Sequence, residues 1–359
     1  MRAHHVGSLL RPSGLRAAYR RHRRGEIGDD EFHRAQDEAI RHVVALQEDV
    51  GLRVVTDGEL RRTSYWSRFV AAVDGLEVGM SRFKFTDATG DRLPCSAPWA
   101  SGTLRCWQPI AGGELDFLAG VATAVPKVTL PSPSTMQFGN GPLSGPYTSS
   151  EDFFADLSAI YRAEIADLAA RGATLVQLDE GALAMLCDPA VRRRVGSAGD
   201  VPGQLVDDYV AAIAEAGADR PEGVTLALHL CRGNYKAHWL AEGGYEPVAE
   251  AVFGGTGVDM LFLEFDSARA GGFEPLRRVP ATTFVVLGLV SSKTPELEPR
   301  DELLRRIEEA SRYLDVERLA LSPQCGFAST AGGNPLSEDD ERRKLGLVVD
   351  VCQEVWGGP

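Results

Sequence analysis

Short apolar runs alternate with longer amphipathic segments along the whole chain of 359 residues. The apolar runs occupy 4–8, 52–57, 124–130, 173–179, 224–230, 259–265, 282–288 and 318–323. The amphipathic segments repeat apolar residues at i, i+3, i+4 and i+7, and they occupy 29–50, 150–172, 206–217, 300–314 and 339–355. The first pattern is typical of buried strands and the second of helices with one buried face. Together they predict an α/β fold in which helices cover a parallel sheet.

The number of strand–helix pairs narrows the fold class further. Eight apolar runs, each followed by a helical segment, predict a (β/α)8 TIM barrel that forms a single catalytic domain over residues 1–359. An open, doubly wound sheet is the alternative. That fold favours a G-x-G-x-x-G turn after the first strand, and "HVGSLLRPSG" at 5–14 has no such turn.

Residues 72–123 fit no strand–helix pair. They contain "SRFKFTDATGDRLPCSAPWASGTLRCWQPIAGGE", which mixes aromatic residues with Gly, Pro and Ser. We interpret this stretch as an insertion after the second strand. Because insertions at that end of a barrel often cover the active site, we expect it to roof the site and to carry specificity, with Trp99 and Trp107 as candidates.

Composition and charge argue against a protein that binds nucleic acid. Hydrophobic residues make up 44% of the chain and charged residues 25%, and the formal net charge is -13. Because nucleic-acid binding needs clustered basic residues, this charge argues against a nucleic-acid partner. The one basic cluster, at 20–31, gives way to acids at once and is typical of a solvated helix end.

The sequence also bears on the location of the protein. No apolar stretch resembles a signal peptide or a membrane span, so we expect neither secretion nor a membrane partner. The six cysteines are scattered along the chain, which favours free thiols over a disulfide framework. These features predict a cytoplasmic protein.

Four side chains that can bind a metal stand where predicted strands end. His229 and Cys231 close the fifth strand, Glu264 closes the sixth, and Cys325 follows the eighth. Side chains two apart on a strand point the same way, and strand ends of a barrel converge on one mouth. Two thiolates, one imidazole and one carboxylate suit zinc. Taken singly, each residue is more often a small core thiol, a hydrogen-bonded histidine or a paired acid.

Six motifs carry a resemblance to a known family. They are "HVGSLLRP", "VVTDGELRR", "QLDEGAL", "HLCRGN", "LEFD" and "SPQCGF", in this order between residues 4 and about 330. This set resembles the catalytic C-terminal barrel of cobalamin-independent methionine synthase, and most closely its short single-barrel relatives. The resemblance implies a zinc ion on His229, Cys231, Glu264 and Cys325, which activates the thiol of homocysteine for methyl transfer.

The resemblance also implies how the amino acid is bound. The turn Val6-Gly7-Ser8 corresponds to the family's turn for the homocysteine carboxylate, with Gly7 and Ser8 as binding residues. Glu59 and Asp179 correspond to the two acids that hold the amino group. Without the resemblance, both acids would also fit helix capping after a strand.

The half of the site that binds the methyl donor departs from the family pattern. We expect no second barrel, and no Trp stands in "PSPSTMQF" at 131–138, where the family stacks folate. Lys293 in "SSKTP" replaces the family's proposed proton-donating His, and it would serve as the catalytic acid only if burial lowered its pKa; a surface position or an anion contact is the alternative. We therefore expect a donor other than folate polyglutamate, such as a corrinoid or a corrinoid protein.

Other functions remain open at this point. The acceptor is a small-molecule thiol, and a coenzyme M-like thiol or a thiol of specialised metabolism is the alternative to homocysteine. A zinc enzyme of another kind on the same barrel, such as a decarboxylase or a hydrolase, needs no thiol. A protein that only binds metal or amino acid would show no turnover with any donor.

Overall fold

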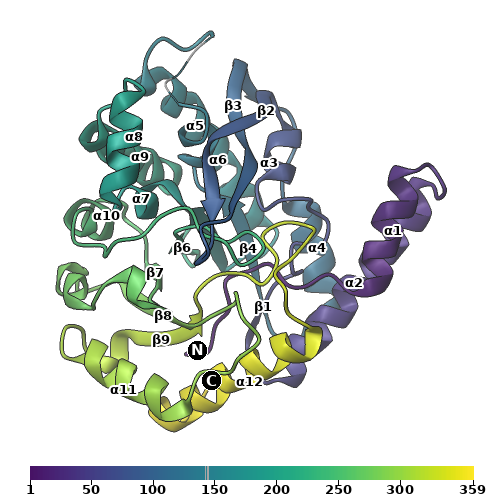
Figure 1. Ribbon diagram of the computed structural model, residues 1–359. Coiled ribbons are helices and arrows are strands. Elements are labelled where there is room, and N and C mark those ends of the chain that lie inside the picture. The colour runs from purple at the N-terminus through teal and green to yellow at the C-terminus, as the bar shows by residue number, and fades with distance from the viewer. Residues whose placement is uncertain (142, 144) are drawn as a thin grey trace.

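A curled, seven-stranded parallel sheet forms the centre of the molecule (Figure 1). The computed structural model describes residues 1–141, 143 and 145–359. The strands lie in the order β1-β4-β5-β6-β7-β8-β9. Their bounds are β1 Val54–Val55, β4 Val125–Pro131, β5 Leu175–Glu180, β6 Thr225–Leu230, β7 Met260–Glu264, β8 Phe284–Val290 and β9 Leu319–Pro323. Because this order follows the chain without a reversal, it is that of a TIM-like barrel and contradicts the doubly wound alternative.

Helices surround the sheet, as the amphipathic segments predict. The helices are α1 Ser13–Arg23, α2 Asp29–Asp49, α3 Ser67–Ala72, α4 Gly112–Val121, α5 Thr135–Phe138, α6 Ser150–Ala170, α7 Ala182–Met185, α8 Pro189–Ser197, α9 Pro202–Ala216, α10 Ala249–Gly255, α11 Arg300–Ser311 and α12 Glu338–Trp356. Short 3-10 turns lie at η1 Ala268–Ala270, η2 Glu274–Arg278 and η3 Val316–Arg318. All five helical segments expected from the sequence are present.

The prediction of a first strand at 4–8 is wrong. The N-terminal segment makes a single parallel bridge, between Ala3 and Leu321 of β9, and residues 4–8 belong to no strand. The reason is that a side chain takes the place of a strand partner. Lys127 Nζ donates to the carbonyl oxygens of His5 and Val6, so these two groups do not enter a regular ladder.

One layer of inward-facing side chains fills the interior of the curled sheet. Six strands contribute one member each, and the layer consists of Val54, Leu175, Ala227, Phe262, Val286 and Ala320. Val125 of β4 packs against the same layer, and the ring of His4 meets Phe262 edge to face. All seven strands of the sheet therefore face one shared interior, as expected of a barrel.

A long antiparallel hairpin interrupts the barrel pattern after β1. It consists of β2 (Val73–Thr86) and β3 (Arg92–Cys106). The expected insertion at 72–123 is thus a hairpin only as far as Cys106. Its last part forms helix α4, which buries Leu115 and Leu118 and packs against β4.

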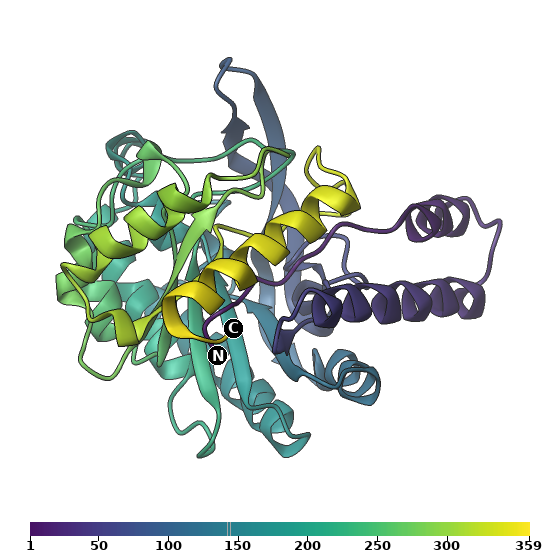
Figure 2. The same ribbon diagram turned by 90° about the horizontal axis from the view of Figure 1, so that it is seen from below.

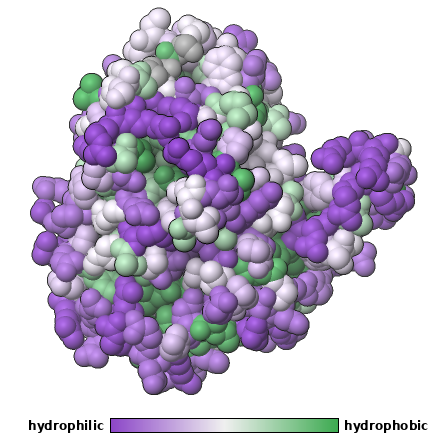
Figure 3. All heavy atoms as spheres, viewed as in Figure 1, coloured by the Kyte–Doolittle hydropathy of each residue, from purple (hydrophilic) through white to green (hydrophobic). Residues whose placement is uncertain are grey.

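Helices α1 and α2 form an arm that projects from the body of the molecule (Figure 2). The surface of this arm is almost entirely hydrophilic (Figure 3). The basic cluster lies at its tip, where Arg21 pairs with Glu31 and His22 with Asp29 at 3.0 and 2.8 Å. The cluster is thus a solvated helix end, as the sequence predicts. Among the described helices, none has the length and apolar character needed to cross a membrane.

Candidate metal centre and substrate cavity

Three of the four predicted metal ligands lie together at the carboxyl end of the sheet. The ligand atoms of His229, Cys231 and Cys325 all lie within 4.8 Å of one another, and all three residues are buried. The two sulfur atoms are 3.4 Å apart. Neither ring nitrogen of His229 makes a hydrogen bond to any of the described residues. A buried imidazole without a partner is unusual, and a metal ion would satisfy it.

The three side chains also influence one another's protonation. Cys231 donates its S–H to Cys325, and this contact raises the pKa of Cys231 and lowers the pKa of Cys325 well below its usual range. Burial alone would lower the pKa of His229, but the Cys325 sulfur and the nearby Asp179 and Glu264 raise it. One thiolate is therefore already favoured before any metal binds.

Glu264, the fourth predicted ligand, lies beside this group and not within it. Its Oε2 accepts a hydrogen bond of 2.8 Å from the backbone N–H of Arg232, the residue that follows Cys231. Its Oε1 is buried, makes no hydrogen bond, and lies 3.6 Å from Arg269 and 3.7 Å from Lys293. Glu264 is fully buried, so this charge needs the cations around it or a metal.

Lys293 is buried, so the surface position considered from the sequence is wrong. Its Nζ lies 3.7 Å from Glu264 and 3.9 Å from Asp266. Burial would lower the pKa of Lys293, but the two carboxylates raise it above its ordinary value. The lowered pKa that a catalytic acid would need here is therefore not found. The catalytic role of Lys293 stays a prediction.

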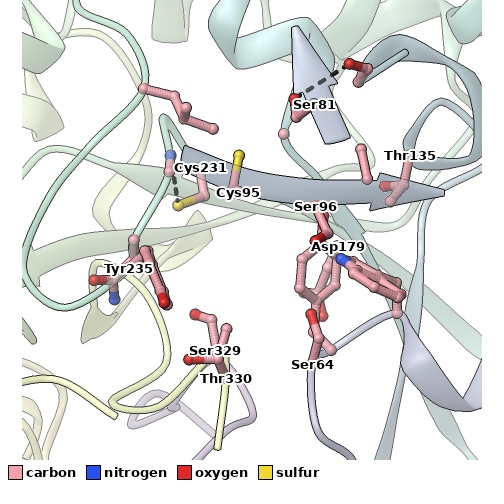
Figure 4. A pocket seen from close by; sticks show the side chains of 18 of the residues that line it. Ser64, Ser81, Cys95, Ser96, Thr135, Asp179, Cys231, Tyr235, Ser329 and Thr330 are labelled. Atoms are coloured by element: carbon pink, nitrogen blue, oxygen red, sulfur yellow. Dashed lines mark hydrogen bonds between the residues drawn. The ribbon is translucent and has the colours of Figure 1, made fainter. Parts of the chain in front are cut away.

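A cavity of about 550 Å³ opens above the three clustered side chains. Figure 4 shows residues of β3, β5 and the loops after β6 and β9 around one space. Ser8, Glu59 and Asp179 line this cavity together with His229, Cys231 and Cys325. Gly7, Glu264 and Lys293 lie outside the lining. The hairpin contributes a whole wall, made by Val78, Met80, Ser81, Phe83, Phe85 and residues 94–98.

The turn at Val6-Gly7-Ser8 is held against the Cys325 loop by close backbone contact. Phe327 N donates to Ser8 O at 2.8 Å. A Cβ added at Gly326 would lie 2.0 Å from Ser8 Oγ and 3.1 Å from Ser8 N, so the two segments approach closely at this glycine. A Cβ added at Gly7 would lie 2.8 Å from Thr129 Cγ2. The predicted carboxylate-binding turn and the predicted metal ligand are therefore neighbours.

The two predicted amino-binding acids have different surroundings. Thr129 Oγ1 donates to Glu59 Oε1 at 2.8 Å, and Arg62 lies 3.8 Å from the same oxygen. Burial, followed by the charge of Glu59, raises the pKa of Asp179 to about 7, although His229 opposes this shift. Two carboxyl groups that line the same cavity favour a bound cation such as an ammonium group.

Sequence reasoning missed several buried charges behind the cavity. Lys127 is 1% exposed and holds the His5 and Val6 carbonyls, and Arg62 forms an ion pair of 2.6 Å with Glu114. The buried charge of Lys127 could have been recognised in the sequence, because this residue interrupts the apolar run "AVPKVTL". A lysine in a buried strand must point at acceptors. The pair Arg62–Glu114 could not have been recognised in this way, since it joins residues 52 apart.

Comparison with known proteins places the chain in a family. The profile of the family described as "Cobalamin-independent synthase, Catalytic domain" matches residues 1–353. The chain belongs to this family. The resemblance inferred from the six motifs is therefore confirmed, and family membership supports an enzyme that is a methyltransferase of the methionine-synthase type.

Individual members of this family align over nearly the whole chain. The uncharacterized protein YxjH of Bacillus subtilis is 37% identical over 362 residues, which covers 99% of this chain and 94% of the relative. A putative vitamin-B12 independent methionine synthase from Listeria monocytogenes has a solved structure with a TM-score of 0.78 and 30% identity, covering 99% and 98% of the two chains. Methionine synthase of Pyrococcus abyssi is 26% identical and covers 90% and 85%.

Proposed function

We propose that this protein transfers a methyl group to the sulfur of homocysteine, with zinc held by His229, Cys231, Cys325 and Glu264. One observation carries the proposal. A nitrogen and two sulfur donors lie within 4.8 Å of one another at a cavity that is also lined by Ser8, Glu59 and Asp179. Donors for a soft metal and groups for an α-amino acid thus border the same space.

The donor set fits zinc on two grounds. Two sulfurs and an imidazole favour zinc over magnesium or calcium, and the His229 nitrogens have no hydrogen-bond partner in the described part of the chain. Glu264 would complete the set through Oε1, which is buried and accepts no hydrogen bond. A bound zinc ion would supply the positive charge that keeps the acceptor thiol deprotonated at neutral pH.

The protein's own residues would orient the amino acid. We assign the ammonium group to Glu59 and Asp179, and the carboxylate to the Gly7–Ser8 turn, whose hydroxyl lines the cavity. Thr129 holds the carboxylate of Glu59 in place at 2.8 Å. Fixing both ends of the amino acid would direct its side-chain sulfur toward the ligand cluster, and such positioning lowers the barrier to transfer.

We further propose that the chain is one domain, in which the N-terminal segment closes the barrel and the hairpin roofs the site. The segment bridges β9 at Ala3, and Thr56 Oγ1 next to β1 donates to Gly7 O at 2.7 Å. It therefore touches both ends of the seven-stranded sheet. Residues of β2 and β3 line one wall of the cavity and would exclude water from the reacting groups. All six cysteines are unpaired, in keeping with a cytoplasmic enzyme.

Metal analysis of matched variants tests the zinc site. Wild-type protein is expected to hold zinc, and Cys325→Ser to lose it, because a hydroxyl is a poor replacement for a thiolate. Glu264→Gln is expected to bind zinc about 10–100-fold more weakly. Cys106→Ser, which changes a cysteine of β3 outside the cavity, is the control and keeps its zinc. Full zinc content in Cys325→Ser would contradict the proposal.

Turnover is measured with the zinc-loaded protein, homocysteine and a panel of methyl donors. Methionine formation that disappears with zinc removal supports the proposal. Transfer to a coenzyme M-like thiol in preference to homocysteine would move the proposal to another acceptor. Lack of thiol binding at the metal would leave a zinc enzyme of another kind, such as a decarboxylase, as the better description.

A further inference from the structure

The aromatic character of the cavity bears on the identity of the methyl donor, which the metal ligands do not define. Six aromatic residues line the cavity, namely Tyr65, Trp66, Phe83, Phe85, Phe138 and Tyr235. Their rings come from the hairpin, from the loop before α3, from α5 and from the loop after β6. The cavity is therefore aromatic on several sides, and such surroundings suit an apolar or cationic group.

The charges of the residues that line the cavity also favour an apolar or cationic group. Among the described residues that line the cavity, none is Lys or Arg, whereas Glu59, Asp179 and Glu180 are acids. Glu180 is occupied by hydrogen bonds from Ser132, Ser134 and the backbone of Leu183. A donor with several carboxylates or phosphates would meet no basic partner here, and burying it would be costly.

Three of the rings already have a basic side chain over them, whereas Phe85, which packs against Tyr235 at 5.3 Å beside the metal ligands, has none among the described residues. Arg82 lies 5.2 Å from the ring centres of both Phe83 and Phe138, and Lys236 lies 5.4 Å from that of Tyr235. Among the described side chains, no Lys or Arg stacks on Phe85. The Phe85 ring packs on the loop after Cys231, because a Cβ added at Gly233 would lie 3.0 Å from Phe85 Cε1.

The position of Lys293 favours a donor whose leaving group needs no proton. A donor that loses its methyl group from nitrogen leaves a basic atom, which needs a proton. Lys293, the residue expected to give that proton, does not line the cavity. A donor whose leaving group departs neutral would need no acid at all.

From these observations we infer that the methyl donor is a methylsulfonium compound, recognised by Phe85 and the surrounding rings; the inference rests on the proposed function. The thiolate sulfur of the acceptor attacks the methyl carbon, and a new S–C bond forms as the C–S⁺ bond breaks. The electron pair of the broken bond remains on the donor sulfur, which leaves as a neutral thioether. The acceptor's thiol proton passes to solvent, and no atom of the donor is protonated.

Binding measurements test the recognition of charge. The probe is S-methylmethionine, titrated into zinc-loaded protein saturated with methionine, which occupies the amino-acid site but has no thiol to methylate. Its matched control is homoleucine, in which a CH group replaces the sulfonium sulfur. We expect S-methylmethionine to bind about tenfold or more tightly than homoleucine, because only the cation is attracted to the ring faces. Equal affinity of the two compounds would overturn the inference.

A pair of variants tests Phe85 itself. With isotopically labelled S-methylmethionine as donor, Phe85→Leu is expected to raise the KM for the donor roughly tenfold with little change in kcat. Phe117 lies on α4 outside the cavity, and its ring stacks with Arg41 and Arg61. Phe117→Leu is the control and is expected to leave KM and kcat unchanged. An unchanged donor KM in Phe85→Leu would contradict the inference.

Failure of this inference can be told apart from failure of the proposed function. If the protein binds zinc and homocysteine and takes the methyl group from methylcobalamin or methyltetrahydropteroyltriglutamate but from no sulfonium, only the donor assignment is wrong. If homocysteine does not bind the zinc-loaded protein, the proposed function is wrong.

Discussion

At the scale of single residues, the site depends on Glu59, whose backbone is held in an unfavourable conformation. Glu59 has a backbone φ of 58°, the left-handed region that residues with a Cβ avoid at a cost of about 1 kcal/mol. Asp57 accepts from its N–H at 2.9 Å, and Arg11 donates to its carbonyl at 3.2 Å. These contacts stabilise the strained backbone and so direct the Glu59 carboxylate into the cavity.

Asp179 leads to a prediction about pH. Burial raises its pKa to about 7, so the carboxyl group is partly protonated near neutrality. Because only the ionised form attracts an ammonium group, the KM for homocysteine should fall as the pH rises from about 6 to about 8. The same shift means that ionised Asp179 costs the folded state stability as the pH rises from about 4 to about 7.

Steady-state kinetics of Asp179→Asn check this prediction. The variant should show a KM for homocysteine that is about tenfold higher and independent of pH over this range. Asp207→Asn, an exposed change on α9, should keep the wild-type profile. A wild-type pH profile in Asp179→Asn would assign the titration to another group.

At the scale of elements, four separate segments meet in one hydrogen-bonded junction beneath the cavity. Gly326 O accepts from Asn234 after β6 and from Ser292 after β8, at 2.8 and 3.0 Å. The loop after β9 also binds the N-terminal segment through Phe327 N and Ser8 O. The loops that carry the predicted ligands are thus fixed to one another and not only to their strands.

Gly326→Ala tests this junction. The added Cβ would displace the Ser8 hydroxyl, which lies 2.0 Å away, and would still crowd Ser8 N and Cβ at 3.1 Å. We expect the free energy of unfolding to fall by about 1–3 kcal/mol and the KM for homocysteine to rise. Gly346→Ala in α12 is the control, since a Cβ there meets nothing within 4 Å, and it should be neutral or slightly stabilising. Denaturant unfolding and steady-state kinetics of both variants measure these effects.

At the scale of the whole molecule, Lys127 joins the N-terminal segment to the interior of the sheet. Its Nζ donates to His5 O and Val6 O, and to Gln177 Oε1 at 2.8 Å, and it lies 4.7 Å from the Phe262 ring. Burial lowers its pKa to about 7, against the charges of Asp179 and Glu59. One side chain therefore connects the chain terminus, β4, β5 and β7.

Lys127→Met should loosen this connection. The His5 carbonyl would lose its donor inside the protein, so we expect the free energy of unfolding to fall by about 2–4 kcal/mol. Because Val6 precedes the Gly7–Ser8 turn, homocysteine should also bind more weakly. Lys84→Met, an exposed change on β2, is the control. Urea unfolding of both variants measures the difference, and an unchanged midpoint in Lys127→Met would contradict this role.

Much of the fold was predictable from the sequence, because strands and helices depend on local periodicity. The runs at 224–230 and 259–265 agree with β6 (Thr225–Leu230) and β7 (Met260–Glu264) to within a residue. Their uninterrupted apolar character already implied burial on both faces. Helix α4 was missed, since "GGELDFLAGV" is short and begins with two glycines that disfavour a helix.

The sequence by itself determined the family, the strand order and the strand ends at which His229, Cys231 and Cys325 stand, since motif order and apolar periodicity are properties of the linear chain. Only the tertiary structure decided which side chains meet. In the folded chain, Glu264 accepts a hydrogen bond from the Arg232 backbone, and Lys293 is buried beside two carboxylates. The aromatic residues of the hairpin line the same cavity as the loop after Cys231. Those outcomes depend on distances between residues far apart in the chain, which packing defines and local sequence does not.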